Sequence, residues 1–174
     1  LSLCLNTSLL EYLFPGRYPS KRYDHREPLE VESAIGACMM VRGQALKEVS
    51  FFDERYFFFF EETDLAFAMK RAGWSVCQVP DALIYHFQGK SIGHNAKSRI
   101  EFYRSRYQFL RKWHGSAYYR AAAAVIFLRL LADALLNAAG VVFTLGLSKN
   151  LRRKLTVYAQ LIQWHFKERV TSEK

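Results

Sequence analysis

Four consecutive phenylalanines followed by a cluster of carboxylates constrain the fold of this chain more than any other feature. Residues 57–60 are phenylalanine, and three of the next four residues are acidic. Phenylalanine is among the residues most often buried, so the run predicts a buried strand or loop. Apolar residues at helical spacing follow, and they predict a helix whose inner face carries Leu65, Ala68, Met69 and Ala72. Gly73 predicts the end of that helix.

The carboxylates at the start of this helix are candidates for chemistry. At about 100° per residue, Glu61 and Glu62 project onto or beside the apolar face. Thr63 and Asp64 point away from it. Acidic residues in a first helical turn also complement the helix dipole, and for Asp64 this alternative has equal weight. It explains Glu61 and Glu62 less well, because a solvated dipole partner has no reason to point inward. The pattern therefore indicates a cleft with carboxylates at its edge.

Length and composition are those of one compact domain with an appendage. At 174 residues the chain can bury one core, and an aromatic content of 16% argues against disorder. A net charge of +9 implies an anionic partner: nucleic acid, anionic lipid or a phosphate-bearing substrate. The three cysteines lack metal-ligand spacing and are predicted to be small core residues in a reducing compartment.

Before residue 95, the sequence pattern predicts strands that alternate with helices, which is typical of an α/β layer. The expected elements are a helix over 1–14, a loop over 17–28, a buried strand over 36–41, a helix over 42–49, and strands over 75–79 and 82–87. Candidate functional groups lie at the ends of these elements, where open α/β sheets place their sites.

Candidate binding groups surround the strand predicted over 82–87. His86 lies at its end, and Lys90 and Ser91 lie in the glycine-containing loop that follows. The lysine, the serine and the backbone amides of that loop are suited to phosphate oxygens. A lone histidine is more often structural than a ligand, but the adjacent loop makes the two interpretations about equal. Gly36, at the head of an earlier strand, leaves room for a ligand or another backbone to approach.

The rest of the chain is predicted to be helical. An amphipathic helix with a cationic side is expected over 97–113, an apolar helix over 121–147 and a basic amphipathic helix over 149–166. The apolar helix carries a polar stripe of Arg129, Asp133 and Asn137, which can pair along the helix. A span of this length could cross a bilayer, at about 2.5–3.5 kcal/mol per isolated charge. The tail is therefore predicted to lie on an anionic membrane surface rather than to span it.

Several short motifs occur in the order found in a known group of enzymes. They occupy residues 36–42, 52–57, 60–65, 72–74, 79–82 and 85–86. Together they resemble the second half of a bacterial inverting glycosyltransferase of family 2, and especially its rhamnosyltransferase-like members. Residues 102–112 also resemble the helix that follows in that group. The resemblance covers about half of the chain. It implies an α/β fold of the GT-A (Rossmann-like) type, followed by an all-helical C-terminal extension.

The resemblance also implies roles for individual residues. Glu62, the second member of the acidic pair, is the implied catalytic base, where the family most often has aspartate. The residues implied to position the acceptor or substrate are Glu61, Asp64, Gly36 and Ala37. Those implied to bind the diphosphate are Lys90, Ser91 and Arg104. His86 is the residue implied to help hold a divalent cation, Mg²⁺ or Mn²⁺, or the diphosphate. Family members usually carry two glycines where this chain has Ser50-Phe51.

The whole protein is expected to transfer a sugar, with rhamnose as a candidate, from a nucleotide-sugar donor to a polysaccharide or lipid-linked acceptor. Residues 1–115 are the expected acceptor-side half of the catalytic domain. Residues 116–174 are the expected membrane-associated extension, peripheral at the cytoplasmic face of the bacterial inner membrane. The nucleotide-binding half, with its Asp-x-Asp motif, is expected upstream of Leu1. The chain alone is therefore expected to be inactive.

Two other classes of protein remain as alternatives. One is a non-catalytic membrane- or partner-binding module, in which the basic helices act and the carboxylates are structural. The other is a nucleic-acid binder, suggested by basic and aromatic residues interleaved over 99–113. The aromatic residues share the face that is expected to be buried, so nucleic acid is not a predicted partner.

Overall fold

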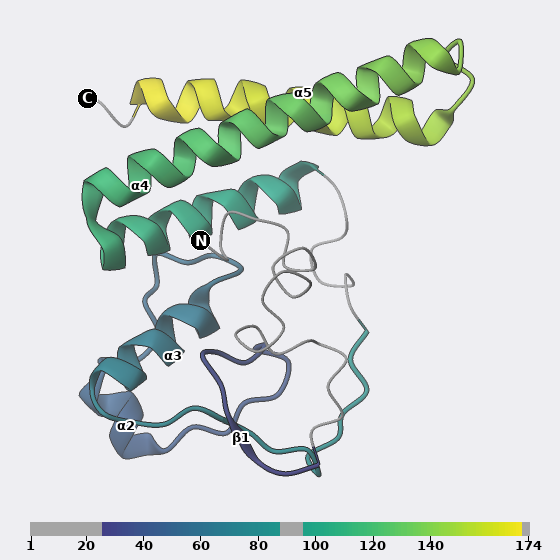
Figure 1. Cartoon of the computed structure of the whole chain (residues 1–174). Helices are drawn as coiled ribbons and strands as arrows, with labels where there is room; N and C mark the ends of the chain where they lie inside the picture. Colours follow the sequence, from purple (N-terminus) through teal and green to yellow (C-terminus); the bar gives the residue numbers. More distant parts are fainter. Residues whose placement is uncertain (1–25, 88–95, 172–174) are drawn as a thin grey trace. The chain divides into compact units, whose positions relative to one another are not determined.

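The computed structural model describes residues 26–87 and 96–171. The chain divides into two compact units, residues 1–87 and residues 88–174 (Figure 1). The helix predicted over 1–14 and the loop residues Lys90 and Ser91 lie outside the described residues. The predicted boundary at residue 115 coincides with a break inside a long helix of the second unit, and that domain division stays a prediction.

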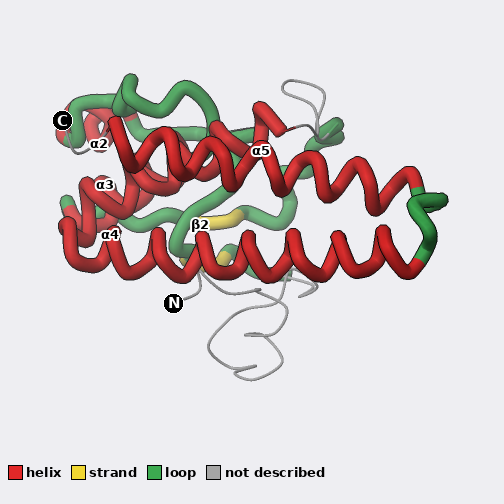
Figure 2. The backbone as a smooth tube through the Cα atoms, turned by 90° about the horizontal axis from the view of Figure 1, so that it is seen from above, coloured by secondary structure: helices red, strands yellow, loops and turns green. Residues whose placement is uncertain are grey.

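The first unit contains two helices and a two-stranded ribbon. Strand β1 (Leu29–Glu30) and strand β2 (Cys77–Gln78) are the yellow segments in Figure 2. They pair antiparallel, with Leu29 opposite Gln78. Val31 extends the pairing, because its N–H donates to the carbonyl of Val76 at 2.8 Å. The helices α2 (Gly43–Glu48) and α3 (Glu61–Arg71) lie between the strands in the sequence. Both helices agree with the predicted ranges.

The core of the first unit joins the two helices. Ala45 of α2 and Leu65 and Met69 of α3 are buried against one another. The partly buried residues that pack on them are Met39, Val41, Leu46, Val49 and Trp74. Polar contacts support this packing, since the indole N–H of Trp74 donates to Glu48 Oε2 at 3.1 Å. The inner face predicted for α3 is confirmed, except that Ala72 is exposed.

Two of the predicted strands do not form. Residues 36–41 and 82–87 are irregular, and the strand predicted over 75–79 is shortened to β2. Met40 and Tyr85 of these segments are about fully exposed, whereas Met39 and Val41 pack on the core without forming a strand. A strand needs a neighbour that bonds its backbone N–H and C=O groups. Within residues 26–87 the only sheet is the pair β1–β2, so the predicted open α/β sheet is not present in the described part of the chain.

The phenylalanine run is buried only at its end. Phe60 is 7% exposed, whereas Phe57 is 82% exposed, so the prediction of four buried rings is wrong at Phe57. Phe58 and Phe59 are half-buried and pack edge to face. The run forms a loop rather than a strand. Phe59 and Phe60 have φ values of 66° and 67°, and this left-handed backbone turns the chain into α3.

Helix α3 ends in a Schellman turn, as Gly73 predicts. Gly73 has a φ of 89° and donates its N–H to the carbonyl of Lys70 at 3.1 Å. Trp74 donates to the carbonyl of Met69 at 3.0 Å. Glycine suits this position because it has no Cβ to clash in the left-handed region.

Helix α2 ends in the same turn with a serine at the glycine position. Ser50 has a φ of 63° and donates to the carbonyl of Lys47 at 3.2 Å, and Phe51 donates to the carbonyl of Leu46. We expect Ser50→Gly to raise the free energy of unfolding by about 0.5–1 kcal/mol. The left-handed conformation costs other residues about 1–2 kcal/mol, and the larger unfolded-state entropy of glycine offsets part of that gain.

Urea unfolding measures this difference. The matched control is Ser75→Gly, because Ser75 is also exposed but is not among the residues with positive φ. The control should lower the free energy of unfolding. Destabilisation of both variants alike would contradict the expected relief of strain at Ser50.

The second unit is a helical hairpin with one internal break. Helix α4 (Ala96–Phe143) is interrupted at Gly115, whose φ of 77° and ψ of 173° lie outside the helical region. Helix α5 (Lys149–Thr171) returns alongside the second half of α4 (Figures 1 and 2). The helices predicted over 97–113, 121–147 and 149–166 are confirmed, although α4 ends at Phe143.

A buried histidine joins α5 to the first half of α4. His165 is 3% exposed, with Nε2 2.6 Å from the Tyr107 hydroxyl and Nδ1 2.8 Å from the carbonyl of Leu161. A carbonyl can only accept, so Nδ1 carries a proton, and in the neutral imidazole Nε2 then accepts from the Tyr107 hydroxyl. Trp164 stacks parallel to the Tyr107 ring. The aromatic face predicted for the first half of α4 is thus part of the packing of this unit.

Among the described residues, α4 is the one helix long and apolar enough to cross a membrane. Only 11% of its most apolar 18-residue window is buried. The predicted polar stripe is present, because Arg129 Nε lies 3.9 Å from Asp133 Oδ2. Asn137 Nδ2 donates to the carbonyl of Asp133 at 2.7 Å. The polar groups of the stripe are therefore paired within the helix.

Candidate carboxylate site

Glu62 lies in the first turn of α3 as a half-buried carboxylate. Its Oε2 is buried and has no hydrogen-bond partner in the described part of the chain. Burial raises the pKa of Glu62, and the charge of Glu61 raises it further. Hydrogen bonds with the backbone of Glu62 and Thr63 act in the opposite direction. A carboxylate with an unpaired oxygen and a raised pKa is suited to accept a proton.

Glu61 shares part of this environment. Its Oε2 is also buried without a hydrogen-bond partner among the described residues. The prediction that Glu61 and Glu62 both face inward is confirmed, since both are half-buried. Two adjacent carboxylates repel each other, and that repulsion favours the protonated form of Glu62.

The loop before α3 places these carboxylates. Phe59 and Phe60 are both left-handed, a conformation that costs a residue other than glycine about 1–3 kcal/mol. The helix begins directly afterwards, with the N–H of Asp64 donating to the carbonyl of Phe60 at 2.8 Å. Glu61 and Glu62 consequently occupy the turn whose own N–H groups have no partner inside the helix. The surrounding contacts have to hold the strained loop in this form.

A buried hydrogen bond provides one such contact. The hydroxyl of Tyr56 donates to Asp64 Oδ1 at 3.0 Å, and both side chains are buried. Burial raises the pKa of Tyr56, and the charge of Asp64 raises it further, so the phenol stays protonated. The bond closes the loop over residues 57–60. We call this pair the Tyr56–Asp64 clamp.

The Tyr56–Asp64 clamp corrects the prediction made for Asp64 and adds Tyr56 to the residues of the candidate site. Asp64 is predicted to point away from the apolar face of the helix, yet it is buried, with 3% of its surface exposed. A helical wheel considers only apolar periodicity, whereas a buried tyrosine hydroxyl also needs an acceptor. Tyr56 was not singled out by sequence reasoning. The sequence feature that could have indicated Tyr56 is its place before the four phenylalanines, because it alone among these five rings carries a hydroxyl. The role of Asp64 in positioning an acceptor stays a prediction.

Gly36 and Glu62 come together although they are distant in sequence. A Cβ on Gly36 would lie 3.6 Å from Glu62 Cβ and 3.8 Å from its Cγ. The close approach predicted at Gly36 is therefore an approach to the Glu62 side chain. Ala37 follows in the same irregular segment and is exposed. The structure thus brings together two of the predicted site residues.

The other predicted site residues stand apart from this pair or outside the described residues. His86 is exposed in an irregular segment of the first unit. Arg104 belongs to the second unit, where it pairs with Glu101 and lies over the ring of Trp164. Lys90 and Ser91 are not among the described residues. The roles of these four residues stay predictions.

The described residues do not fit a metal centre. Within residues 26–87 and 96–171, no group of three His, Cys, Asp or Glu side chains could hold a metal ion. His86 has no such companions there. The predicted Mg²⁺ or Mn²⁺ site is therefore not found in this part of the chain.

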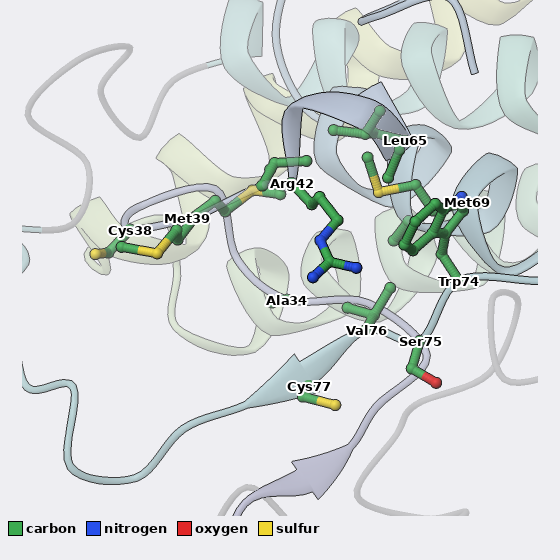
Figure 3. A pocket seen from close by; sticks show the side chains of 14 residues that line it. Ala34, Cys38, Met39, Arg42, Leu65, Met69, Trp74, Ser75, Val76 and Cys77 are labelled. Atoms are coloured by element: carbon green, nitrogen blue, oxygen red, sulfur yellow. The ribbon is translucent and has the colours of Figure 1, made fainter. Parts of the chain in front are cut away.

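A cavity of about 170 Å³ lies beside the core of the first unit. Arg42 stands among its lining side chains, with its guanidinium 5.7 Å from the centroid of the Trp74 ring (Figure 3). Cys38 and Cys77 are also in the lining, and both are exposed free cysteines rather than the core residues predicted. Glu62 does not line the cavity. The cavity is thus not the cleft predicted from the carboxylates.

Comparisons with known proteins find similarity over the same region. Residues 21–108 match the family model described as "Glycosyltransferase like family 2". The chain is 37% identical over 103 residues to N-acetylglucosaminyl-diphospho-decaprenol L-rhamnosyltransferase of Mycobacterium tuberculosis, in strains CDC 1551 / Oshkosh and ATCC 25618 / H37Rv. The alignment covers 58% of this chain and 33% of each relative. The chain therefore spans about a third of the length of the curated relatives it matches. No solved structure matches the chain.

Proposed function

Because the chain belongs to the glycosyltransferase-like family 2, we propose that it forms the acceptor-side part of an inverting glycosyltransferase with a GT-A fold. Glu62 is the proposed general base. The observation that carries this role is its half-buried carboxylate, which has an unpaired buried oxygen and a pKa raised by burial. The similarity to the M. tuberculosis rhamnosyltransferases supports rhamnose as the sugar and a lipid-linked acceptor.

In the proposed reaction the acceptor hydroxyl loses its proton to Glu62. The acceptor oxygen bonds to the anomeric carbon of a nucleotide sugar from the face opposite the diphosphate, which inverts the configuration. The bond from that carbon to the diphosphate oxygen breaks, and the diphosphate leaves with the electron pair. A raised pKa makes ionised Glu62 a stronger base than an ordinary carboxylate. The Tyr56–Asp64 clamp and Gly36 hold the position of that base.

The leaving diphosphate gains negative charge and needs positive groups near it. Lys90, Ser91 and Arg104 are the proposed ligands, because the family match includes all three positions. The divalent cation that the family resemblance implies would supply further positive charge to the diphosphate. The described residues contain no ligand cluster for it.

The proposed place of the reaction is the cytoplasmic face of the bacterial inner membrane. A lipid-linked acceptor would be held in the bilayer, while a nucleotide sugar would arrive from the cytoplasm. The net charge of +9 suits an anionic leaflet. We propose that the protein is attached there peripherally.

The test is a transfer assay with two proteins: the 174-residue chain, and the longest polypeptide that its gene encodes. Each is incubated with a panel of nucleotide sugars, rhamnose donors included, and a polyprenyl-diphosphate N-acetylglucosamine acceptor. We expect transfer only by a polypeptide about as long as the matched relatives, because the chain spans a third of their length. Turnover by the chain alone would contradict its expected inactivity. A full-length polypeptide that transfers none of the sugars would favour the non-catalytic module.

A further inference from the structure

Between Arg129 and Lys149, every exposed side chain of the helical hairpin is apolar. These side chains are Ala132, Leu135, Leu136, Ala139, Val142, Phe143, Leu145 and Leu147. The six largest are 71% to 89% exposed, so they belong to no core within the second unit. A contiguous apolar surface of this kind indicates a partner. We call residues 130–148 the hairpin tip.

The polar groups within the hairpin tip are satisfied by the hairpin itself. Asp133 is half-buried beside Arg129, and its carbonyl accepts from Asn137 Nδ2. The Thr144 hydroxyl donates to the carbonyl of Gly140 at 2.8 Å. Ser148 Oγ accepts a hydrogen bond from the backbone N–H of Leu151, in the first turn of α5, at 3.4 Å. An apolar surrounding would therefore leave few of these groups unpaired, which is the main requirement for entry into lipid.

The exposed charges at the start of α5 are all positive. They belong to Lys149, Arg152, Arg153 and Lys154. No acidic residue occurs between residues 149 and 167. Lipid phosphates attract such a cluster, whereas the same cluster on a second copy of the hairpin would repel it. The charge pattern therefore favours an anionic bilayer over a second copy as the partner of the hairpin tip.

We propose that the hairpin tip inserts in plane into the interface of an anionic bilayer. The outer face of α4 enters the acyl-chain region to a depth of about 5–10 Å. The cationic start of α5 binds lipid phosphates. This inference deepens the proposed peripheral attachment to a membrane. It rests on the proposed function only for the identity of that membrane.

The charges of the hairpin, rather than its length, favour this orientation over a spanning one. The second half of α4, residues 116–143, is about 42 Å long at 1.5 Å per residue, which is enough to cross the ~30 Å hydrocarbon core of a bilayer. A spanning hairpin would carry Arg129, Asp133 and the exposed cations of α5 into the hydrocarbon, where charges are strongly disfavoured. Immersion of the apolar outer face of the tip does not require this.

Co-sedimentation of the 174-residue chain with vesicles tests the apolar contact. With phosphatidylethanolamine and phosphatidylglycerol vesicles, the triple variant Phe143→Ser, Leu145→Ser and Leu147→Ser should partition at least about tenfold less than the wild type. The matched control is Met40→Ser, Leu83→Ser and Phe87→Ser, which removes apolar groups of similar exposure from the first unit. The control should bind like the wild type. Circular dichroism checks that both variants keep their helices.

Charge is tested in the same assay. Glutamine at Lys149, Arg152, Arg153 and Lys154 should weaken binding to anionic vesicles by about tenfold or more. Glutamine at four other exposed cations, Lys47, Arg71, Lys97 and Arg120, makes the same change in net charge and should weaken binding less. Wild-type binding should also fall on phosphatidylcholine vesicles or in about 0.5 M salt.

Two results would overturn the proposal. One is unchanged vesicle binding by the triple tip variant. The other is self-association of the wild type, measured by sedimentation, that the tip variant abolishes while vesicle binding persists. The second result would assign the surface to another copy of the chain. Vesicle binding without sugar transfer would refute the proposed enzymatic function but support the proposed membrane insertion of the hairpin tip. The failures of the two proposals are therefore distinguishable.

Discussion

Replacing Glu62 by glutamine should lower the turnover of the sugar-transferring polypeptide by about 10²–10⁴-fold, with donor binding nearly unchanged. Glutamine keeps the shape and the hydrogen-bonding capacity of the side chain but cannot take up the acceptor proton. Steady-state kinetics with donor and acceptor varied separately give kcat and both KM values. The matched control is Glu61→Gln, because Glu61 lies in the same helical turn and also has a buried unpaired oxygen. It should lose less activity.

The pH dependence of stability separates loss of chemistry from loss of fold. Burial raises the pKa of Glu62, so the folded protein holds that proton more tightly than the unfolded chain. The resulting stabilisation is fully present below the unfolded pKa of about 4.3 and is lost as the pH rises through the folded pKa. Ionised Glu62 therefore destabilises the folded state near neutral pH, and glutamine does not.

We accordingly expect Glu62→Gln to melt at the same temperature as the wild type or higher near neutral pH, with the difference shrinking near pH ~4. A lower melting temperature would mean that the carboxylate supports the fold. Near-normal turnover would remove Glu62 from the mechanism and make Asp64 the next candidate for the base.

Replacing Tyr56 by phenylalanine should lower the free energy of unfolding by about 2 kcal/mol. The change deprives Asp64, which is 3% exposed, of the hydrogen bond that it accepts from the Tyr56 hydroxyl. Loss of a partner by a buried charged group costs about 1–3 kcal/mol or more. Urea unfolding measures the effect. The control is Tyr85→Phe, which removes a hydroxyl from a side chain that is 99% exposed and should change nothing.

Asp64→Asn distinguishes a clamp from a base. Asparagine can still accept the Tyr56 hydrogen bond, so we expect a smaller loss of stability and little loss of turnover. The pKa of Tyr56 is raised by burial and by Asp64, so the stabilisation from this phenol is complete below about pH 10 and is lost as the pH rises further. Abolished turnover in Asp64→Asn together with full activity in Glu62→Gln would reverse the roles assigned to the two carboxylates.

Helices and their ends could be predicted from the sequence because their causes are local. The apolar spacing of Leu65 and Met69 predicts the buried face of α3, and Gly73 predicts its end. The polar stripe of the second half of α4 follows from the four-residue spacing of Arg129, Asp133 and Asn137. Within a helix, each backbone group finds its partner four residues away. The pattern of nearby residues is therefore sufficient.

Strands were predicted less well because their partners are distant. Residues 36–41 and 82–87 have the composition of buried strands, yet the described structure gives them no neighbour to pair with. The pairing that does form, between β1 and β2, joins segments separated by two helices. Apolar composition shows that a segment can be buried, but only the rest of the fold supplies the strand that buries it.

The sequence by itself determined the helices, the acidic pair at the head of α3 and the family resemblance. Only the tertiary structure decided which carboxylate is anchored and which is left short of partners. Asp64 is buried because the Tyr56 hydroxyl needs an acceptor, and Glu62 lies against Gly36 because residues far apart in the chain pack together. Burial of the Glu62 carboxylate is the main cause of its raised pKa. Burial depends on contacts across the whole unit, which no local pattern encodes.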